Sequence, residues 1–291
     1  MKTIFSTFFA IVICLASCTS ELSKSQEIID THTHIKFGEE VYSFGDNKPA
    51  TPESLLQQMQ KNNIKLAGIL TIAKKGNKEK TRSQNDMIIA LARKHPNKFY
   101  PIGSIHPLDG KSALDELRRL LSQNVKFLKL HPNAQAFDLA SKEVNAVVHL
   151  AGEHGMVVLF DGYSPFDANQ IGKFIKLAIA NPKANIIIAH LGGPMFHQLE
   201  TIGILNKYPG YQRNLWFDVS AALPMYVNSP YWDQLQWIMR EIGIDRILFG
   251  SDFPIYSITE TLNAFKKLDL TKEEQDKVLS KNARKLMNIT K

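Results

Sequence analysis

The sequence predicts a single-domain α/β protein of the (β/α)8 or TIM-barrel class, with one extra helix at its C-terminal end. Two observations favour this fold. Eight short apolar runs alternate with helix-like stretches along residues 26–291, and the runs are continuously apolar, as expected for parallel strands buried on both faces. The glycine patterns of phosphate and dinucleotide loops, which mark many open parallel sheets, are absent.

The predicted strands and helices follow one another along the chain without a second domain or a longer repeat. The strands are expected at 27–30, 66–73, 99–105, 125–130, 156–160, 185–189, 215–219 and 246–249. The helices are expected at 52–62, 82–94, 111–121, 141–154, 167–180, 232–241 and 258–267, with 272–287 as the additional helix. Thr51-Pro52 is a typical helix start, a capping residue followed by proline.

The N-terminal residues differ from the rest of the chain. Met1-Lys2 is a short positive start, and the nearly unbroken apolar run from Thr3 to Ala16 is too short to span a bilayer but suits a secretion signal. The run ends in Leu15-Ala16-Ser17-Cys18, which resembles the lipobox of bacterial lipoproteins. We therefore expect a signal peptide at 1–17, a lipidated Cys18 with a polar tether at 18–25, and a lipid-anchored protein of the bacterial cell envelope. An ordinary soluble secretion signal is the alternative.

Composition excludes several classes of function. The chain has two cysteines, and removal of residues 1–17 leaves only Cys18, so neither cysteine catalysis nor a cysteine-rich zinc site is expected. The same removal takes away one lysine and lowers the formal charge from +7 to +6 (7 − 1). Because no basic block with interleaved aromatic residues occurs, nucleic acid is not an expected partner.

Polar residues follow seven of the eight predicted strands, at the ends where a barrel forms its active site. The first strand is followed by Asp30-Thr31-His32-Thr33-His34. Residues two apart on a strand point to the same side, so His32 and His34 are expected to share one cation, against the alternative of an ordinary surface pair. The later strands deliver further candidates, namely His106, Lys129 with His131, Asp161, His190, Asp218 with Ser220, and Ser251 with Asp252.

Each of these candidates has a chemical role to offer and a structural alternative. Asp252, in Phe-Gly-Ser-Asp-Phe-Pro, can ligate a metal and accept the proton of bound water, or it can cap the following helix. His190 can ligate metal or polarise a carbonyl oxygen, or it can be a satisfied core histidine. Lys129 can bind a substrate carboxylate, bridge two metals if carbamylated, or pair with an aspartate. His131 and His106 are expected to contact substrate, and a structural role is the alternative for His106 and for Asp218.

Four motifs in this order, Asp-Thr-His-Thr-His, Phe-Leu-Lys-Leu-His-Pro, Ile-Ile-Ala-His-Leu-Gly-Gly and Ile-Leu-Phe-Gly-Ser-Asp-Phe-Pro, resemble the amidohydrolase superfamily. They are most similar to its amidohydrolase-related branch of lactonases, decarboxylases and hydrolases of small acids. The resemblance runs from about Ile28 to the C-terminus. It implies a (β/α)8 barrel, a divalent metal on His32 and His34, Asp252 as ligand or base, and His190 as ligand or catalytic histidine.

One position departs from the family pattern. A histidine commonly ends the fifth strand as a metal ligand, whereas this chain has Asp161 in Phe-Asp-Gly-Tyr. Carboxylate oxygen also binds zinc, and hard oxygen ligands suit manganese, so Asp161 either retunes the metal or marks a branch that has lost it.

The sequence thus predicts a metal-dependent hydrolase that attacks an amide, ester or lactone of a small acidic or cyclic substrate. Zn²⁺ is the expected cofactor, with Mn²⁺ as the alternative. The expected catalytic residues are Asp252, His190 and Lys129, and the expected metal ligands are His32, His34, Asp161, His190 and Asp252. Two alternatives stay open, a non-oxidative decarboxylase of the same branch and a lipoprotein that binds a small molecule without catalysis.

Overall fold

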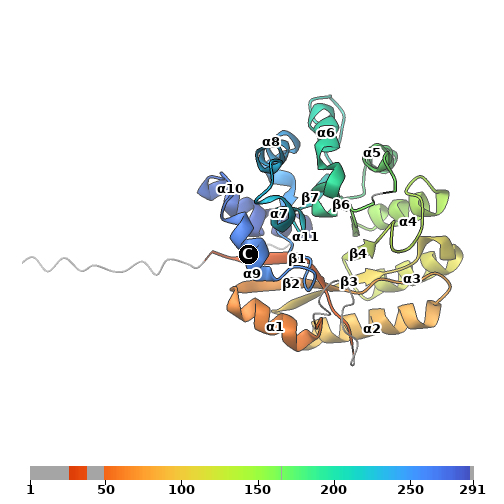
Figure 1. Cartoon of the computed structure of the whole chain (residues 1–291). Helices are drawn as coiled ribbons and strands as arrows, with labels where there is room; N and C mark the ends of the chain where they lie inside the picture. Colours follow the sequence, from red (N-terminus) through yellow and green to blue (C-terminus); the bar gives the residue numbers. More distant parts are fainter. Residues whose placement is uncertain (1–25, 38–48, 165, 289–291) are drawn as a thin grey trace, which may run out of the picture.

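The structure is a computed structural model that describes residues 26–37, 49–164 and 166–288 (Figure 1). Eight parallel strands lie in the order β1 to β8, and each is hydrogen-bonded to the next. The strands are β1 (Ile28–His34), β2 (Ile64–Leu70), β3 (Phe99–Ser104), β4 (Phe127–Leu130), β5 (Val157–Phe160), β6 (Ile186–Ile188), β7 (Leu215–Asp218) and β8 (Ile247–Leu248). The predicted TIM-barrel class is confirmed.

The sheet closes through residues just beyond β8. The backbone N–H of Thr31 donates to Phe249 O at 2.9 Å, and the N–H of His34 donates to Phe253 O at 2.7 Å. Between these contacts, the N–H of Asp252 donates to His32 O at 2.9 Å. Closure of the barrel therefore lays the Asp252 segment directly beside the His32–His34 motif.

Helices surround the strands on the outside, as Figure 1 shows. They are α1 (Pro52–Lys61), α2 (Lys78–Lys94), α3 (Lys111–Ser122), α4 (Lys142–Glu153), α5 (Gln170–Ala180), α6 (Glu200–Leu205), α7 (Ala222–Tyr226), α8 (Trp232–Ile242), α9 (Ile258–Phe265), α10 (Lys272–Asp276) and α11 (Asn282–Met287). Thr51 caps α1 by accepting a hydrogen bond from Ser54 N at 3.1 Å, as the sequence predicts.

Apolar side chains fill both sides of the sheet. The larger cluster packs between the strands and the helices, and a smaller one lies inside the barrel, where Ile102, Phe127 and Leu159 contribute. Ala283 and Leu286 of α11 belong to this inner cluster. Because the apolar layer fills part of the interior, polar side chains reach the barrel axis only near the carboxyl ends of the strands.

The structure corrects three details of the predicted elements. His32 and His34 do not follow β1 but belong to it, because pairing with β2 continues to Thr33↔Ile69 and His34↔Leu70. A second correction concerns residues between β6 and β7, where no helix was expected. They form 3₁₀ turns within Ala189–Leu199, interrupted by the left-handed backbone of residues 190–193, and the short helix α6.

The third correction concerns the C-terminal end, where one helix was expected over 272–287. A π-helical stretch at Lys277–Lys281 separates α10 from α11. The two capping-box bonds between Thr271 and Glu274 fix the start of α10, which the sequence placed correctly. The predicted leader, Cys18 and tether lie outside the described residues. Within the described residues, no helix is long and apolar enough to cross a membrane.

Candidate metal and catalytic site

Six polar side chains from six different strands or strand ends meet inside the barrel. All of them are at most 6% exposed, so water screens their charges poorly. They are His32 of β1, Lys129 of β4, Asp161 after β5, His190 after β6, Asp218 of β7 and Asp252 after β8. His34 joins them from β1.

Three of these side chains form a candidate metal site. His34 Nε2 lies 3.1 Å and His32 Nε2 lies 3.5 Å from the same oxygen, Oδ1 of Asp252. The two imidazole rings lie on one side of β1 with centroids 5.2 Å apart, which confirms the two-residue rule used on the sequence. Two imidazole nitrogens and one carboxylate oxygen are a ligand set that suits zinc or manganese.

The donor atoms of this site fit a cation. Oδ1 of Asp252 is buried without a hydrogen-bond partner among the described residues, which is costly unless a positive charge faces it. Burial, followed by the Lys129 charge, lowers the pKa of His32 to about 4, and burial also lowers the pKa of His34. Both imidazoles are therefore neutral and keep a lone pair. Although burial opposes it, the neighbouring His190, His34 and His32 lower the pKa of Asp252, which is ionised.

Asp218 orients His32 from behind. Its Oδ2 lies 3.1 Å from Nδ1 of His32, so Nδ1–H donates to the carboxylate and Nε2 faces the barrel axis. The other oxygen, Oδ1, accepts from the N–H groups of His190 and Ser220, both at 3.0 Å, and from the Ser220 hydroxyl. His32, His190 and Asp218 also lie close enough to hold an ion, but these bonds use the acceptor capacity of Asp218. Asp218 therefore has a supporting position, and His32, His34 and Asp252 are the better candidate ligands.

Lys129 is fully buried and contacts the same histidine. Its Nζ lies 2.9 Å from His32 Nε2 and 3.6 Å from Asp161 Oδ2. The ammonium group donates to the lone pair that a metal on His32 would use. Asp161 offers the ammonium a second partner close by, so a metal on His32 would require Nζ to shift toward that carboxylate.

Asp161 and His190 form a buried ion pair. His190 Nε2 lies 3.0 Å from Asp161 Oδ2, and His190 Nδ1 lies 3.0 Å from the Ser220 carbonyl oxygen. Burial opposes a charge on His190, yet the carboxylates of Asp161 and Asp252 raise its pKa to about 9. His190 is therefore an imidazolium that donates from both nitrogens. The charges of His131, His190 and Lys129 overcome burial and hold the pKa of Asp161 well below its ordinary value.

The backbone that presents this pair is unusual. His190 has a φ of 59°, in the left-handed region that non-glycine residues rarely adopt. Gly162 follows Asp161, and a Cβ at this position would lie 2.1 Å from the Ala189 carbonyl oxygen. Only glycine lets the two loops approach closely enough to bring Asp161 to His190.

Asp30 links the two ends of the metal site. Its Oδ1 accepts from the backbone N–H of His32 at 3.2 Å and from the N–H of Ser251 at 3.0 Å. These bonds join β1 to the segment that carries Asp252. Asp30 and Asp218 had no assigned role in the sequence interpretation. Their position at strand ends was the only available signal, because the residues they hold are remote in the sequence.

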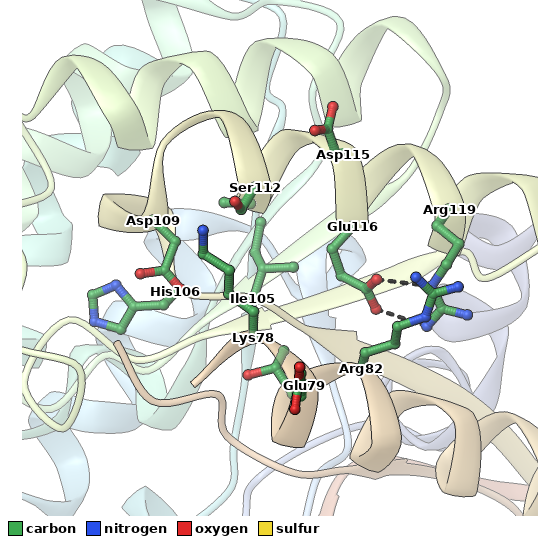
Figure 2. A pocket seen from close by; sticks show the side chains of 12 residues that line it. Lys78, Glu79, Arg82, Ile105, His106, Asp109, Ser112, Asp115, Glu116 and Arg119 are labelled. Carbon is green, nitrogen blue, oxygen red and sulfur yellow. Dashed lines mark hydrogen bonds and ion pairs between the residues drawn. The ribbon is translucent and has the colours of Figure 1, made fainter. Parts of the chain in front are cut away.

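The two predicted substrate contacts lie in different places. His131 lies at the edge of the site, with Nε2 3.5 Å from Asp161 Oδ2. His106 makes no described hydrogen bond or ion pair with the central residues, and its Nε2 instead donates to Gln135 O at 2.8 Å. His106 lies at a separate cavity of about 390 Å³, which is also lined by side chains of α2 and α3. Figure 2 shows His106 at one edge of this cavity and the ion pair of Glu116 and Arg119 at the other. Contact of either histidine with substrate stays a prediction.

Comparison with known families agrees with this geometry. The family model described as Amidohydrolase matches residues 29–289. This chain belongs to the amidohydrolase family. The match begins one residue after the start of β1 and ends beyond α11, so it includes every residue of the candidate site.

Several solved structures show the same fold. A 2,6-dihydroxybenzoate decarboxylase, solved with 2,6-dihydroxybenzoate, has a TM-score of 0.73 at 16% identity, covering 91% of this chain and 100% of that one. A dihydroxybenzoic acid decarboxylase from Polaromonas sp. JS666 with bound manganese has a TM-score of 0.70 at 15% identity, covering 91% and 98%. A probable 2-pyrone-4,6-dicarboxylic acid hydrolase from Acinetobacter baumannii has a TM-score of 0.65 at 18% identity, covering 90% and 99%. No curated protein shows significant sequence similarity to the chain.

Proposed function

We propose that this amidohydrolase-family protein is a metal-dependent hydrolase that cleaves an amide, ester or lactone of a small acidic or cyclic substrate. The observation that carries the proposal is the buried, unpartnered Oδ1 of Asp252 facing Nε2 of both His32 and His34. A divalent cation held there, Zn²⁺ in our proposal and Mn²⁺ as the alternative, would lower the pKa of a water molecule toward neutrality.

The surrounding residues supply the remaining chemistry. Asp252 is ionised and buried, so it can accept the proton of the attacking water. The ammonium of Lys129 can donate a hydrogen bond to the carbonyl oxygen on which negative charge develops. The imidazolium of His190, whose two N–H groups are bonded to Asp161 and to the Ser220 carbonyl oxygen, adds positive charge nearby. The same cations favour a substrate that carries a carboxylate.

In this proposal Asp161 is not a metal ligand, as the histidine common at its position in the family is, but positions neighbouring hydrogen-bond donors. Its Oδ2 already faces His190 at 3.0 Å, His131 at 3.5 Å and Lys129 at 3.6 Å. A carboxylate surrounded by three nitrogens keeps His190 charged and gives Lys129 an alternative partner. We therefore propose that Asp161 positions these donors, with metal ligation as the alternative that the experiment below distinguishes.

The first experiment measures metal content by mass spectrometry in the wild type and in His32→Ala, His34→Ala, Asp252→Asn and Asp161→Asn. We expect one equivalent of metal in the wild type and a strong loss in the first three variants, with retention in Asp161→Asn. His149→Ala, an exposed histidine on α4, is the matched control and should keep its metal. A wild type that binds neither zinc nor manganese would overturn the proposal in favour of metal-free catalysis or simple binding.

The reaction itself is tested with small lactones, amides and esters that carry a carboxylate, and in parallel with hydroxylated aromatic acids. Hydrolysis that disappears in His32→Ala and Asp252→Asn supports the proposal. Release of carbon dioxide from an aromatic acid, without hydrolysis of any member of the first set, would instead assign the protein to the decarboxylases.

We also propose that the protein is anchored in the bacterial cell envelope by a lipid on Cys18. The support is the leader and the Leu-Ala-Ser-Cys motif of the sequence. Cys18→Ser should move the protein from the membrane fraction to the soluble fraction and abolish incorporation of labelled fatty acid. Unchanged membrane recovery of that variant would refute the anchor.

A further inference from the structure

One end of the barrel carries a cluster of basic side chains remote from the catalytic site. It is formed by the loops that enter β2, β3 and β4, at the end where the strands begin. Residues 61–65, 93–98 and 122–126 contain no aspartate or glutamate. Their cations are all exposed, and we call them the basic patch: Lys61, Lys65, Arg93, Lys94, Lys98 and Lys126.

The three loops are neighbours in space. Ala67 N donates to Lys98 O at 2.9 Å, which joins the first loop to the second across β2 and β3. Arg93 donates to the side-chain oxygen of Gln123 at 2.6 Å, which joins the second loop to the third. The three loops that carry the basic patch therefore lie side by side.

Its charges are not neutralised by the protein. No ion pair with a described carboxylate includes any residue of the basic patch. The other loops at the same end differ, because each of their cations faces a carboxylate. Lys183 lies 3.0 Å from Glu153, Arg213 lies 3.0 Å from Asp245, and Lys207 lies 3.7 Å from Glu241. Among the described loops that enter the strands at this end, the unpaired cations therefore lie on the loops that enter β2, β3 and β4; Lys285 of α11, also exposed, lies 6.0 Å from the centre of the Trp216 ring.

The described chain enters the barrel beside this patch. Ile28, the first residue of β1, pairs with Ile64, which is the neighbour of Lys65. Seven residues lie between Cys18 and Gln26, and an extended chain over these eight Cα–Cα steps reaches at most ~28 Å. A lipid on Cys18 would therefore keep the point where the chain enters the barrel, which lies at this end, within ~28 Å of the bilayer surface.

We propose that the basic patch binds the surface of a membrane that contains anionic lipid, and that it orients the catalytic end toward the aqueous phase. Lysine and arginine near an anionic surface are attracted electrostatically, and the attraction is lost within about 10 Å in physiological salt. The patch lies at the end of the barrel where the anchored chain enters, so the short tether allows its cations to come inside that range. This inference goes beyond the proposed reaction and does not depend on it. The position of the membrane rests on the proposed anchor, whereas binding of the patch to lipid does not.

The test uses the mature chain with Cys18→Ser, so that no acyl chain contributes to binding. Co-flotation is measured with vesicles of phosphatidylcholine alone and of phosphatidylcholine mixed with phosphatidylglycerol, at low and high salt. One variant changes all six residues of the basic patch to glutamine. The matched control changes six exposed lysines at the opposite end of the barrel to glutamine, with the same loss of net charge: Lys74, Lys75, Lys78, Lys80, Lys111 and Lys142.

The wild type and the matched control should float with the anionic vesicles at low salt and release them at high salt. The patch variant should bind at least ~100-fold more weakly, because each removed cation weakens surface attraction several-fold. Far-ultraviolet circular dichroism and thermal unfolding verify that both variants are folded.

Three outcomes would overturn the inference. They are failure of the wild type to bind anionic vesicles, equal weakening in the matched control, and tighter binding of single-stranded RNA than of vesicles. Equal weakening would indicate that net charge alone attracts the protein, and preference for RNA would assign the patch to a different partner. None of these outcomes bears on metal content or hydrolysis, so failure here is distinguishable from failure of the proposed function.

Discussion

Replacement of Asp30 by asparagine should change the way stability depends on pH. Asp30 is fully buried, and its Oδ2 has no hydrogen-bond partner among the described residues. Burial raises its pKa from 3.8 to about 7, in spite of the hydrogen bonds from Ser251 and His32 that favour the charged form. Asparagine keeps an oxygen for these two bonds and removes the charge.

The sign follows from proton linkage. Between pH 3.8 and about 7 the folded wild type holds a proton on Asp30 that the unfolded chain has released. Its free energy of unfolding therefore falls as the pH rises through this window, and the penalty is complete above pH 7. The pKa difference corresponds to ~4 kcal/mol in all, of which ~2.5 kcal/mol develops between pH 5 and pH 8. The Asp30→Asn variant lacks this contribution.

The assay is urea denaturation of the wild type and Asp30→Asn at several pH values, in the presence of a chelator so that metal binding does not contribute. Subtracting one pH profile from the other removes every titrating group that the two proteins share. We expect the variant to gain ~2.5 kcal/mol relative to the wild type between pH 5 and pH 8. Parallel profiles would refute the reasoning, because they would mean that Asp30 is ionised in the folded protein at an ordinary pKa.

Three further predictions concern the site and its support. Asp218→Asn should lower zinc affinity by about 10- to 100-fold, because Nδ1 of His32 loses its carboxylate partner. Competition with a chelating indicator measures the affinity, and an unchanged value would contradict the role of Asp218 in orienting His32. Gly162→Ala should lose ~2 kcal/mol or more of stability in urea denaturation, since its Cβ would lie 2.1 Å from Ala189 O. Catalytic activity should be lost as well. A variant as stable as the wild type would show that the loop can move freely. Phe174→Ala should cost ~3–5 kcal/mol through the cavity it leaves in the core, with zinc affinity retained, and a loss of metal without loss of stability would argue against a purely packing role.

The sequence was most informative where a signal is local. Strand positions could be predicted from continuous apolar runs, and the joint orientation of His32 and His34 from the period of a strand. Even there, the end of β1 could not be predicted, because the polar motif resembles a loop while its backbone stays paired to β2. The segment after β6 was also missed, since its apolar Gly-Gly-Pro composition carries no helical period.

The site was predictable as a set of residues but not as a network. Asp252 and His190 follow apolar strands, a pattern that reads directly from the sequence. Their partners do not: Lys129 contacts His32 across 97 positions, and Asp218 contacts His32 across 186. His106 illustrates the converse, because it follows a strand like the others and yet lies on a separate cavity.

By itself, the sequence determined the barrel class, because burial period is a property of neighbouring residues, and its four motifs indicated the family. The candidate metal ligands could also be named from the sequence, because strand-end chemistry is local. Only the tertiary structure decided which oxygen of which aspartate faces which nitrogen. It assigned Asp218 to orient His32, paired Asp161 with His190, and placed the basic patch beside the entry of the chain. These pairings depend on closing eight strands into one ring, and the closure fixes distances that no local pattern contains.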